Sequence, residues 1–115
     1  MKVAIIGSRS FSDYSLVEEA LRTSIDVNTI TVIISGGAKG ADTLAEKFAA
    51  DYSLEIQIFK PDWKLYGRGA GIVRNKQIIE SADKIFAFWD GKSKGTLNSI
   101  NIAKKLGKYL TIVRY

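Results

Sequence analysis

The chain has 115 residues, 46% of them hydrophobic and 25% charged, which suits one compact domain, and its net charge is +5. It contains no cysteine and no histidine, which excludes thiol nucleophiles, imidazole general bases and the usual zinc sites. No apolar run is long enough to span a bilayer and Met1-Lys2 leads directly into a strand, so we expect a cytoplasmic protein.

Short apolar runs alternate with helical patterns along the whole chain. We expect strands at residues 3–6, 30–34, 54–59, 84–88 and 109–113. Residues 54–59 alternate apolar and polar side chains, which is typical of a strand at a sheet edge, and residues 109–113 are the other predicted edge.

The first two helices lie between these early strands. Ser12 or Ser15 is expected to cap the first helix, Ser15 in a capping box with Glu18. The second helix has the clearest periodicity, and its predicted buried stripe consists of Ala41, Leu44, Ala45, Phe48, Ala49 and Tyr52.

The later helices flank the fourth strand. The third helix is expected at residues 69–81, and the last is expected to end at Gly107. The predicted buried stripe of the third helix consists of Ile72, Ile79 and Ala82. Arg74 and Asn75 interrupt that stripe and are expected to reach towards a crevice. The alternative is that Asn75 holds a loop carbonyl and that Arg74 pairs with Asp62 or Asp90.

Helices between successive strands imply a parallel sheet with right-handed crossovers and helices on both faces. With the two edge-type strands outermost, the predicted strand order is 3-2-1-4-5. The sequence therefore predicts an α/β fold, a three-layer Rossmann-like domain over residues 1–115. This order leaves a ligand crevice between the first and fourth strands, at their carboxyl ends.

The loops that lead from strands to helices carry most of the polar chemistry. Residues 35–42 are expected to aim backbone amides at an anion, with Gly36, Gly37 and Gly40 leaving room for it. Asp42 is expected to fix the turn or to receive a ribose hydroxyl. A tight turn without a ligand is the alternative. Residues 89–96 form a second glycine-containing loop before a helix, for which a solvated lysine turn is the alternative.

Aromatic residues stand at the starts of two of these loops. Trp63 and Trp89 either stack on a base or close the end of the sheet, and Phe11 and Tyr66 are weaker candidates for stacking.

Five motifs follow one another in a set order. They are Gly7-Ser8-Arg9, residues 35–42, Asp62-Trp63 with Tyr66-Gly67, Ala70-Gly71 with Arg74-Asn75, and Trp89-Asp90-Gly91 with Ser93-Lys94-Gly95-Thr96. Together they resemble the SLOG superfamily, and more narrowly its small stand-alone branch of bacterial and phage proteins related to the YspA and YpsA families. The resemblance implies a domain that binds a nucleotide or a nucleotide-derived small molecule, ADP-ribose-like or a nucleoside phosphate, as a sensor or a sequestering protein.

The superfamily also contains LOG-type phosphoribohydrolases, in which an Arg on the third helix and a Glu after a Gly-Thr turn carry the chemistry. Arg74 and Gly95-Thr96 resemble that Arg and that turn, but Leu97-Asn98-Ser99 follows where the Glu is expected. A phosphoribohydrolase acting as an N-glycosidase on nucleoside monophosphates is therefore the alternative to a binding module. Its catalytic candidates are Arg74, Asp42, Asp62 and Asp90.

Residues 35–42 also resemble the DNA-processing protein A family, which holds single-stranded DNA on a related domain. Because no extended basic groove is visible in the sequence, nucleic acid is the third choice and is not expected as a partner; neither is a membrane. Asp62 and Asp90 are the positions considered for Mg²⁺ held through water beside a phosphate, and no direct metal ligands are predicted. The two edge strands leave self-association open.

The predicted partner is thus a nucleotide-derived small molecule at the carboxyl edge of the sheet. The predicted ligand-binding residues are Gly7, Ser8, Arg9, Phe11, Ser35, Gly36, Gly37, Ala38, Gly40, Asp42, Asp62, Trp63, Gly71, Arg74, Asn75, Trp89, Asp90, Ser93, Gly95 and Thr96.

Overall fold

The computed structural model describes residues 1–115 and contains one sheet of five parallel strands in the order β3-β2-β1-β4-β5. The strands are β1 (Lys2–Gly7), β2 (Val32–Ser35), β3 (Glu55–Ile58), β4 (Lys84–Trp89) and β5 (Tyr109–Arg114). The predicted order is confirmed, and the strand ends differ from the prediction by only one or two residues, as frayed ends usually do.

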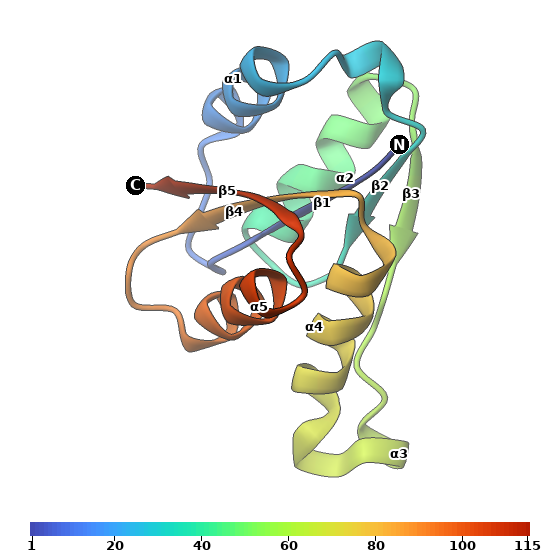
Figure 1. Ribbon diagram of the computed structural model, residues 1–115, viewed down its shortest axis with the longest axis vertical. Helices are drawn as coiled ribbons and strands as arrows, with labels where there is room; N and C mark the ends of the chain where they lie inside the picture. Colours follow the sequence, from blue (N-terminus) through green and yellow to red (C-terminus); the bar gives the residue numbers. More distant parts are fainter.

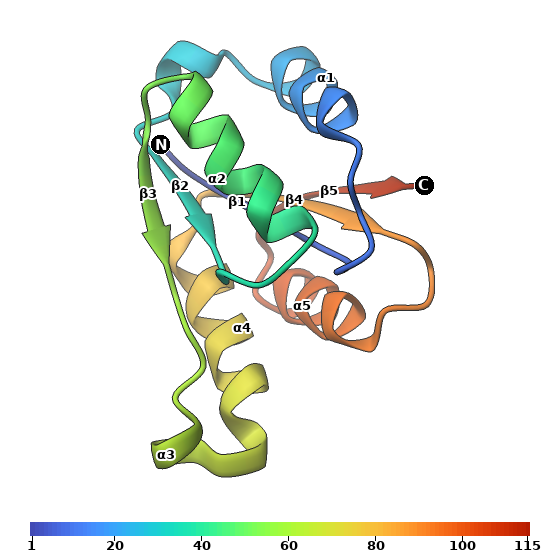
Figure 2. The ribbon, with the colours of Figure 1, turned by 180° about the vertical axis from the view of Figure 1, so that it is seen from behind.

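Helices cover both faces of this sheet. One face carries α1 (Tyr14–Ser24) and α2 (Ala41–Asp51), and the other carries α4 (Ala70–Ser81) and α5 (Lys94–Lys105) (Figures 1 and 2). A 3-10 turn at Val27–Thr29 links α1 to β2. None of the helices has the length and hydropathy that crossing a bilayer requires.

Each face of the sheet has its own apolar core. Along β1, Val3 and Ile5 pack towards α1 and α2, whereas Ala4 and Ile6 pack towards α4 and α5. Successive residues of a strand point to opposite faces, so a central strand covered by helices on both sides has to be apolar throughout. The uninterrupted apolar runs in the sequence follow from this three-layer packing.

Local capping differs from the prediction at the first helix. The Asp13 carboxylate caps α1 by accepting a hydrogen bond from the Leu16 amide at 3.1 Å. The prediction of a cap at Ser12 or Ser15 was wrong, because the helix begins at Tyr14 and Ser15 already lies within its first turn. The last helix ends as predicted: Gly107 follows its cap with a φ of 66°.

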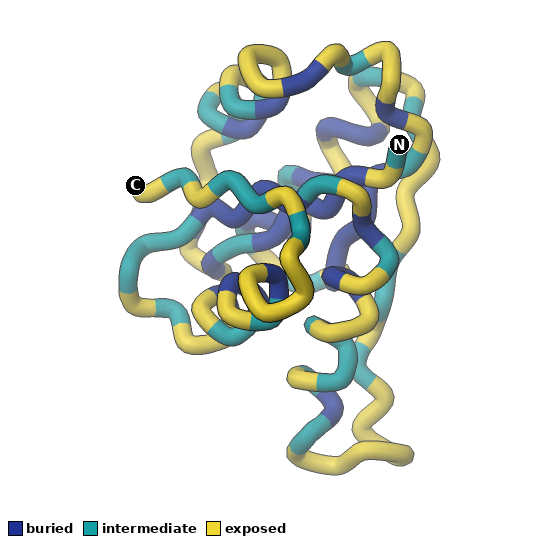
Figure 3. Tube along the Cα trace, viewed as in Figure 1, coloured by how far each residue is buried: buried dark blue, intermediate teal, exposed yellow.

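The segment before α4 forms a projecting arm that the sequence did not predict. It contains α3 (Trp63–Tyr66), capped by Asp62, and a 3-10 turn at Gly67–Gly69. The arm extends beyond the sheet and is largely exposed (Figures 1 and 3). Ile72 lies where α4 leaves this arm and is 59% exposed, so its assignment to the buried stripe was wrong; Ile79 and Ala82 are buried as predicted.

Candidate ligand-binding cleft

Loops that leave the carboxyl ends of the strands enclose two adjoining hollows. The inner hollow has a volume of about 450 Å³ and reaches Ile6 and Ile78 in the core. The outer hollow has a volume of about 850 Å³ and extends towards α3. Both volumes lie in the range of small-molecule and ligand clefts. The residues common to both walls are Arg9, Gly36, Ala38, Arg74, Asn75 and Gly95.

Most of the predicted ligand-binding residues line this cleft. Those on one or both hollows are Gly7, Ser8, Arg9, Gly36, Gly37, Ala38, Asp42, Trp63, Gly71, Arg74, Asn75, Asp90, Ser93, Gly95 and Thr96. Those that line neither are Phe11, Ser35, Gly40, Asp62 and Trp89.

Two of the aromatic candidates are structural. Phe11 is buried and stacks on Phe88 with ring centroids 4.9 Å apart. The Trp89 indole donates a hydrogen bond to the Ser93 carbonyl at 3.0 Å, and the Arg114 guanidinium lies 5.2 Å from its ring centroid. These contacts favour the alternative to base stacking, in which Trp89 closes the end of the sheet.

The glycine loop at residues 35–42 uses its own polar groups to hold its shape. The Gly37 amide donates to the Ser35 hydroxyl at 3.3 Å, and the Ala38 amide donates to Asp42 Oδ2 at 3.0 Å. Two amides that the sequence predicted for an incoming anion are therefore already engaged. The loop binds a carboxylate from its own chain where a phosphate was expected.

Gly40 serves the packing of this loop. Its φ is 74°, and a Cβ at this position would collide with the backbone of Ser8 and Arg9. The neighbouring Ala41 amide donates to the Ser8 carbonyl at 3.3 Å. A glycine is thus required here to seat the first residues of α2 against the loop that follows β1.

Asp42 is a buried carboxyl group in the wall of the inner hollow, with 8% of the residue exposed. Burial raises its pKa, and the Ala38 hydrogen bond and the charge of Arg74 only partly oppose this effect. No cation forms an ion pair with it.

Arg74 stands between the two hollows. Its Nη1 donates to the Gly36 carbonyl at 2.9 Å, and its Nε donates to Asn75 Oδ1 at 3.0 Å. The Asn75 amide in turn donates to Asn98 Oδ1 at 3.2 Å. The guanidinium pairs with neither aspartate that the sequence offered as a partner, and Nη2 has no hydrogen bond to protein. Partial burial lowers the Arg74 pKa, but a guanidinium stays charged at neutral pH.

Carboxylates and hydroxyls dominate the inner hollow. Asp90 Oδ1 accepts hydrogen bonds from the Lys92 and Ser93 amides, both at 2.8 Å, and these bonds lower its pKa. Ser99 is 5% exposed, lines the hollow and makes no hydrogen bond to protein. The sequence drew attention to Ser99 only as a residue near the missing Glu. Its place on α5 one turn after Thr96 could have assigned it to the same wall.

The outer hollow is basic. It is lined by Arg9, Lys60, Arg68, Arg74 and Lys94 and by no carboxylate. The exposed side chains of Trp63 and Ile72 complete its wall. No extended basic groove was visible in the sequence, because these cations come from separate segments of the chain and only the fold brings them together.

The chain is similar in sequence to a known protein family and to a phage protein. A family model described as the YspA, cpYpsA-related SLOG family matches residues 1–66. The Gene 61 protein of Mycobacterium phage D29 is 32% identical over 113 residues, which cover 92% of this chain and 90% of that protein.

A solved structure of DNA processing protein A from Helicobacter pylori has the same fold, with a TM-score of 0.73 and 24% sequence identity. The match covers 97% of this chain and 64% of that one, so this chain spans somewhat under two thirds of the neighbour's length. That structure is described as giving insight into a unique single-stranded DNA binding mode. The expectation that nucleic acid is not a partner is corrected by this match and by the basic outer hollow.

Proposed function

The chain belongs to the YspA, cpYpsA-related SLOG family, and from this premise we propose that its cleft binds single-stranded nucleic acid. The observation that carries the proposal is the outer hollow, which has five Lys and Arg side chains in its wall and no carboxylate. A cleft lined by charges of one sign concentrates a ligand of the opposite charge, and a nucleic-acid strand carries a regular series of negatively charged phosphates.

The remaining wall of the outer hollow supports the same ligand. Trp63 is 62% exposed on α3, beside Lys60 and Arg68. An exposed indole next to cations is the arrangement by which proteins stack a base while they hold its backbone. The described binding mode of the neighbour with this fold adds further support.

Salt dependence tests this function. We expect a fluorescently labelled oligothymidylate to bind with an affinity that falls linearly on a log–log plot against salt, with a slope of about −0.7 for each phosphate contact. Arg68→Gln should weaken binding and reduce the slope by about one such contact. Lys104→Gln is the matched control, since Lys104 is exposed on α5 and lines neither hollow. Absence of binding at low salt, or equal effects of the two variants, would refute the proposal.

A nucleotide-derived small molecule, ADP-ribose-like or a nucleoside phosphate, is the second candidate ligand, for a sensing or sequestering role. The inner hollow favours it, because its size and its polar lining suit a sugar and a base. Neither Asn98 nor Ser99 replaces the carboxylate that LOG-type hydrolysis uses, so we expect binding without turnover. A thermal shift with AMP or ADP-ribose, together with an unchanged ligand mass, is the expected result.

A further inference from the structure

The two hollows differ sharply in charge although they share a wall. Arg9 and Arg74 stand on the shared wall and are the only cations of the inner hollow, where Asp42 and Asp90 balance them. The outer hollow adds three further cations and no acid. A ligand that spans both is therefore expected to place its anionic part outside and an uncharged part inside.

The inner hollow is poorly suited to a phosphate. Asp42 already occupies the Ala38 amide of the glycine loop, and Asp90 occupies the Lys92 and Ser93 amides before α5. Three of the backbone donors that could bind a phosphate at these loops are thus taken by carboxylates of the protein itself. Asp42 and Asp90 also offset the attraction that Arg9 and Arg74 would exert on a phosphate in this hollow.

The same hollow is well suited to a hydroxyl-bearing group. Ser8, Thr96 and Ser99 line it and are each at least nine-tenths buried. The Ser99 hydroxyl makes no hydrogen bond to protein, and because no buried side-chain polar atom of this protein lacks a partner, this hydroxyl is accessible from the hollow and can bond a ligand. The Asp42 carboxylate is a ready acceptor for a ligand hydroxyl, and Ile6 and Ile78 give the hollow an apolar floor for a sugar or a base.

A nucleoside inside a strand carries a phosphate on both its 5′ and its 3′ oxygen, whereas a terminal nucleoside carries one phosphate and one free hydroxyl. We propose that the inner hollow takes the terminal nucleoside of a strand through its free hydroxyl, with the adjoining phosphates in the outer hollow. This inference rests on the proposed function and makes it more specific, because it assigns the site to strand ends.

Four versions of one short oligothymidylate test the inference: with hydroxyls at both ends, with a phosphate at the 5′ end, with a phosphate at the 3′ end, and with phosphates at both. We expect the doubly phosphorylated strand to bind at least about tenfold more weakly than the doubly hydroxylated one. One of the two singly phosphorylated strands should retain full affinity, and this identifies the end that enters. Equal affinities, or tighter binding of the phosphorylated ends, would overturn the terminal site while leaving the proposed function intact. Absence of binding by all four would overturn both.

Two variants test whether the preference for a hydroxyl at the strand end arises in the inner hollow. Asp42→Asn keeps an oxygen for the Ala38 amide but removes the charge, so it should reduce the penalty for the doubly phosphorylated strand. Asp62→Asn is the matched control, because Asp62 caps α3 outside both hollows and asparagine also caps helices. Ser99→Ala should weaken only strands with a free hydroxyl at the entering end. An unchanged end preference in both Asp42→Asn and Ser99→Ala would exclude the inner hollow as the terminal site.

Discussion

At the scale of single residues, the absence of a side chain at Gly36 leaves room for both Arg74 and Asp42 against the glycine loop. A Cβ at position 36 would lie 2.7 Å from Arg74 Nη1 and 3.0 Å from Asp42 Oδ2, both closer than ordinary packing allows. The guanidinium can occupy the boundary between the hollows, and donate to the Gly36 carbonyl, only because this side chain is absent.

Gly36→Ala should therefore displace Arg74 and weaken oligonucleotide binding by about 1 kcal/mol, or roughly fivefold. Gly69→Ala is the matched control, since nothing lies within 4 Å of a Cβ at that position and its φ of −81° suits alanine. Fluorescence anisotropy measures both variants. An unchanged affinity for Gly36→Ala would show that the position of Arg74 is unimportant for binding.

Asp42 makes stability depend on pH. Because burial raises the pKa of this carboxyl group in the folded protein above the ordinary value of 3.8, the folded protein holds the proton to higher pH than the unfolded chain. The contribution of Asp42 to the free energy of unfolding thus falls as the pH rises from 3.8 through the raised pKa. Asp42→Asn lacks this loss, so its stability relative to the wild type should increase over that range in urea denaturation. A difference that is constant with pH would argue against a raised pKa.

At the scale of elements, α3 is the part of the cleft wall that depends least on the sheet. Trp63 and Tyr66 are both exposed on this helix, but only Trp63 lines the outer hollow. The two residues therefore separate a contribution to binding from a general effect of exposed aromatic surface.

Trp63→Ala should weaken oligonucleotide binding by about 1–3 kcal/mol if the indole stacks on one base. Tyr66→Ala should leave the affinity unchanged. Both affinities are measured at the same salt concentration, and equal losses in the two variants would count against a specific stacking role for Trp63.

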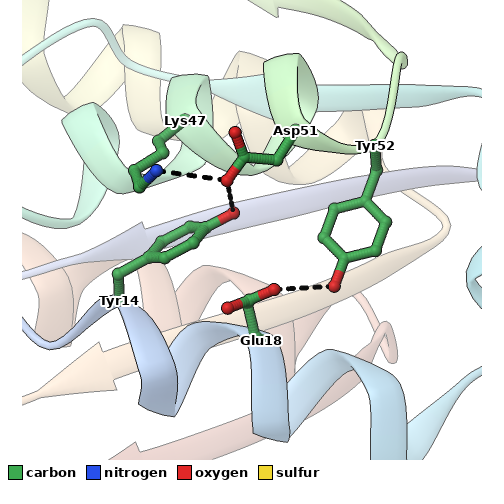
Figure 4. Close-up of polar contacts among 5 residues, drawn as sticks. All are labelled: Tyr14, Glu18, Lys47, Asp51 and Tyr52. Atoms are coloured by element: carbon green, nitrogen blue, oxygen red, sulfur yellow. Dashed lines mark hydrogen bonds and ion pairs between the residues drawn. The ribbon is translucent and has the colours of Figure 1, made fainter.

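Polar side chains link α1 and α2 at an interface away from the cleft. Tyr14 on α1 donates to Asp51 Oδ2 at 2.7 Å, and Lys47 on α2 contacts the same oxygen at 3.2 Å (Figure 4). Nearby, the Tyr52 hydroxyl donates to Glu18 at 2.7 Å. Burial and the hydrogen bond to Asp51 raise the pKa of Tyr14, so its hydroxyl remains a donor at neutral pH.

Tyr14→Phe removes this hydrogen bond and should lower the melting temperature by a few degrees without changing ligand affinity. Tyr109→Phe serves as the control, because the Tyr109 ring contacts Lys84 but its hydroxyl has no hydrogen bond to protein. A loss of affinity in Tyr14→Phe would mean that this interface also shapes the cleft.

At the scale of the whole molecule, the two halves of the chain carry opposite charge. Residues 1–57 contain five Lys and Arg residues and eight Asp and Glu residues, whereas residues 58–115 contain twelve and four. The first half supplies α1 and α2, and the second supplies α3, α4 and α5, so the charge divides between the two faces of the sheet (Figure 1). Such an asymmetry turns the α4–α5 side towards a polyanion during encounter.

The fold was readable from the sequence because its signals are local and periodic. The apolar runs gave the strands, the alternation of residues 54–59 gave one edge, and the polar loops then had to gather at the carboxyl edge of a parallel sheet. The cations of the outer hollow were harder to predict from the sequence. Lys60, Arg68 and Lys94 belong to no shared motif, and they line one surface only after the chain has folded.

Two other features depended on side-chain contacts that no pattern encodes. Trp63 and Trp89 both begin loops, and only the contacts of Trp89 with Ser93 and Arg114 reveal which of the two is structural. The sequence correctly offered Asp42 as a residue that fixes its turn. It did not reveal that this carboxylate takes up the Ala38 amide, which was expected to bind phosphate.

A crystal structure of the protein with a short oligothymidylate would locate the bound strand. We expect backbone phosphates beside Arg68 and Lys94 in the outer hollow, with a nucleoside and no phosphate in the inner hollow. A phosphate against the Asp42 loop, or a strand bound on the α1–α2 face, would contradict this expectation.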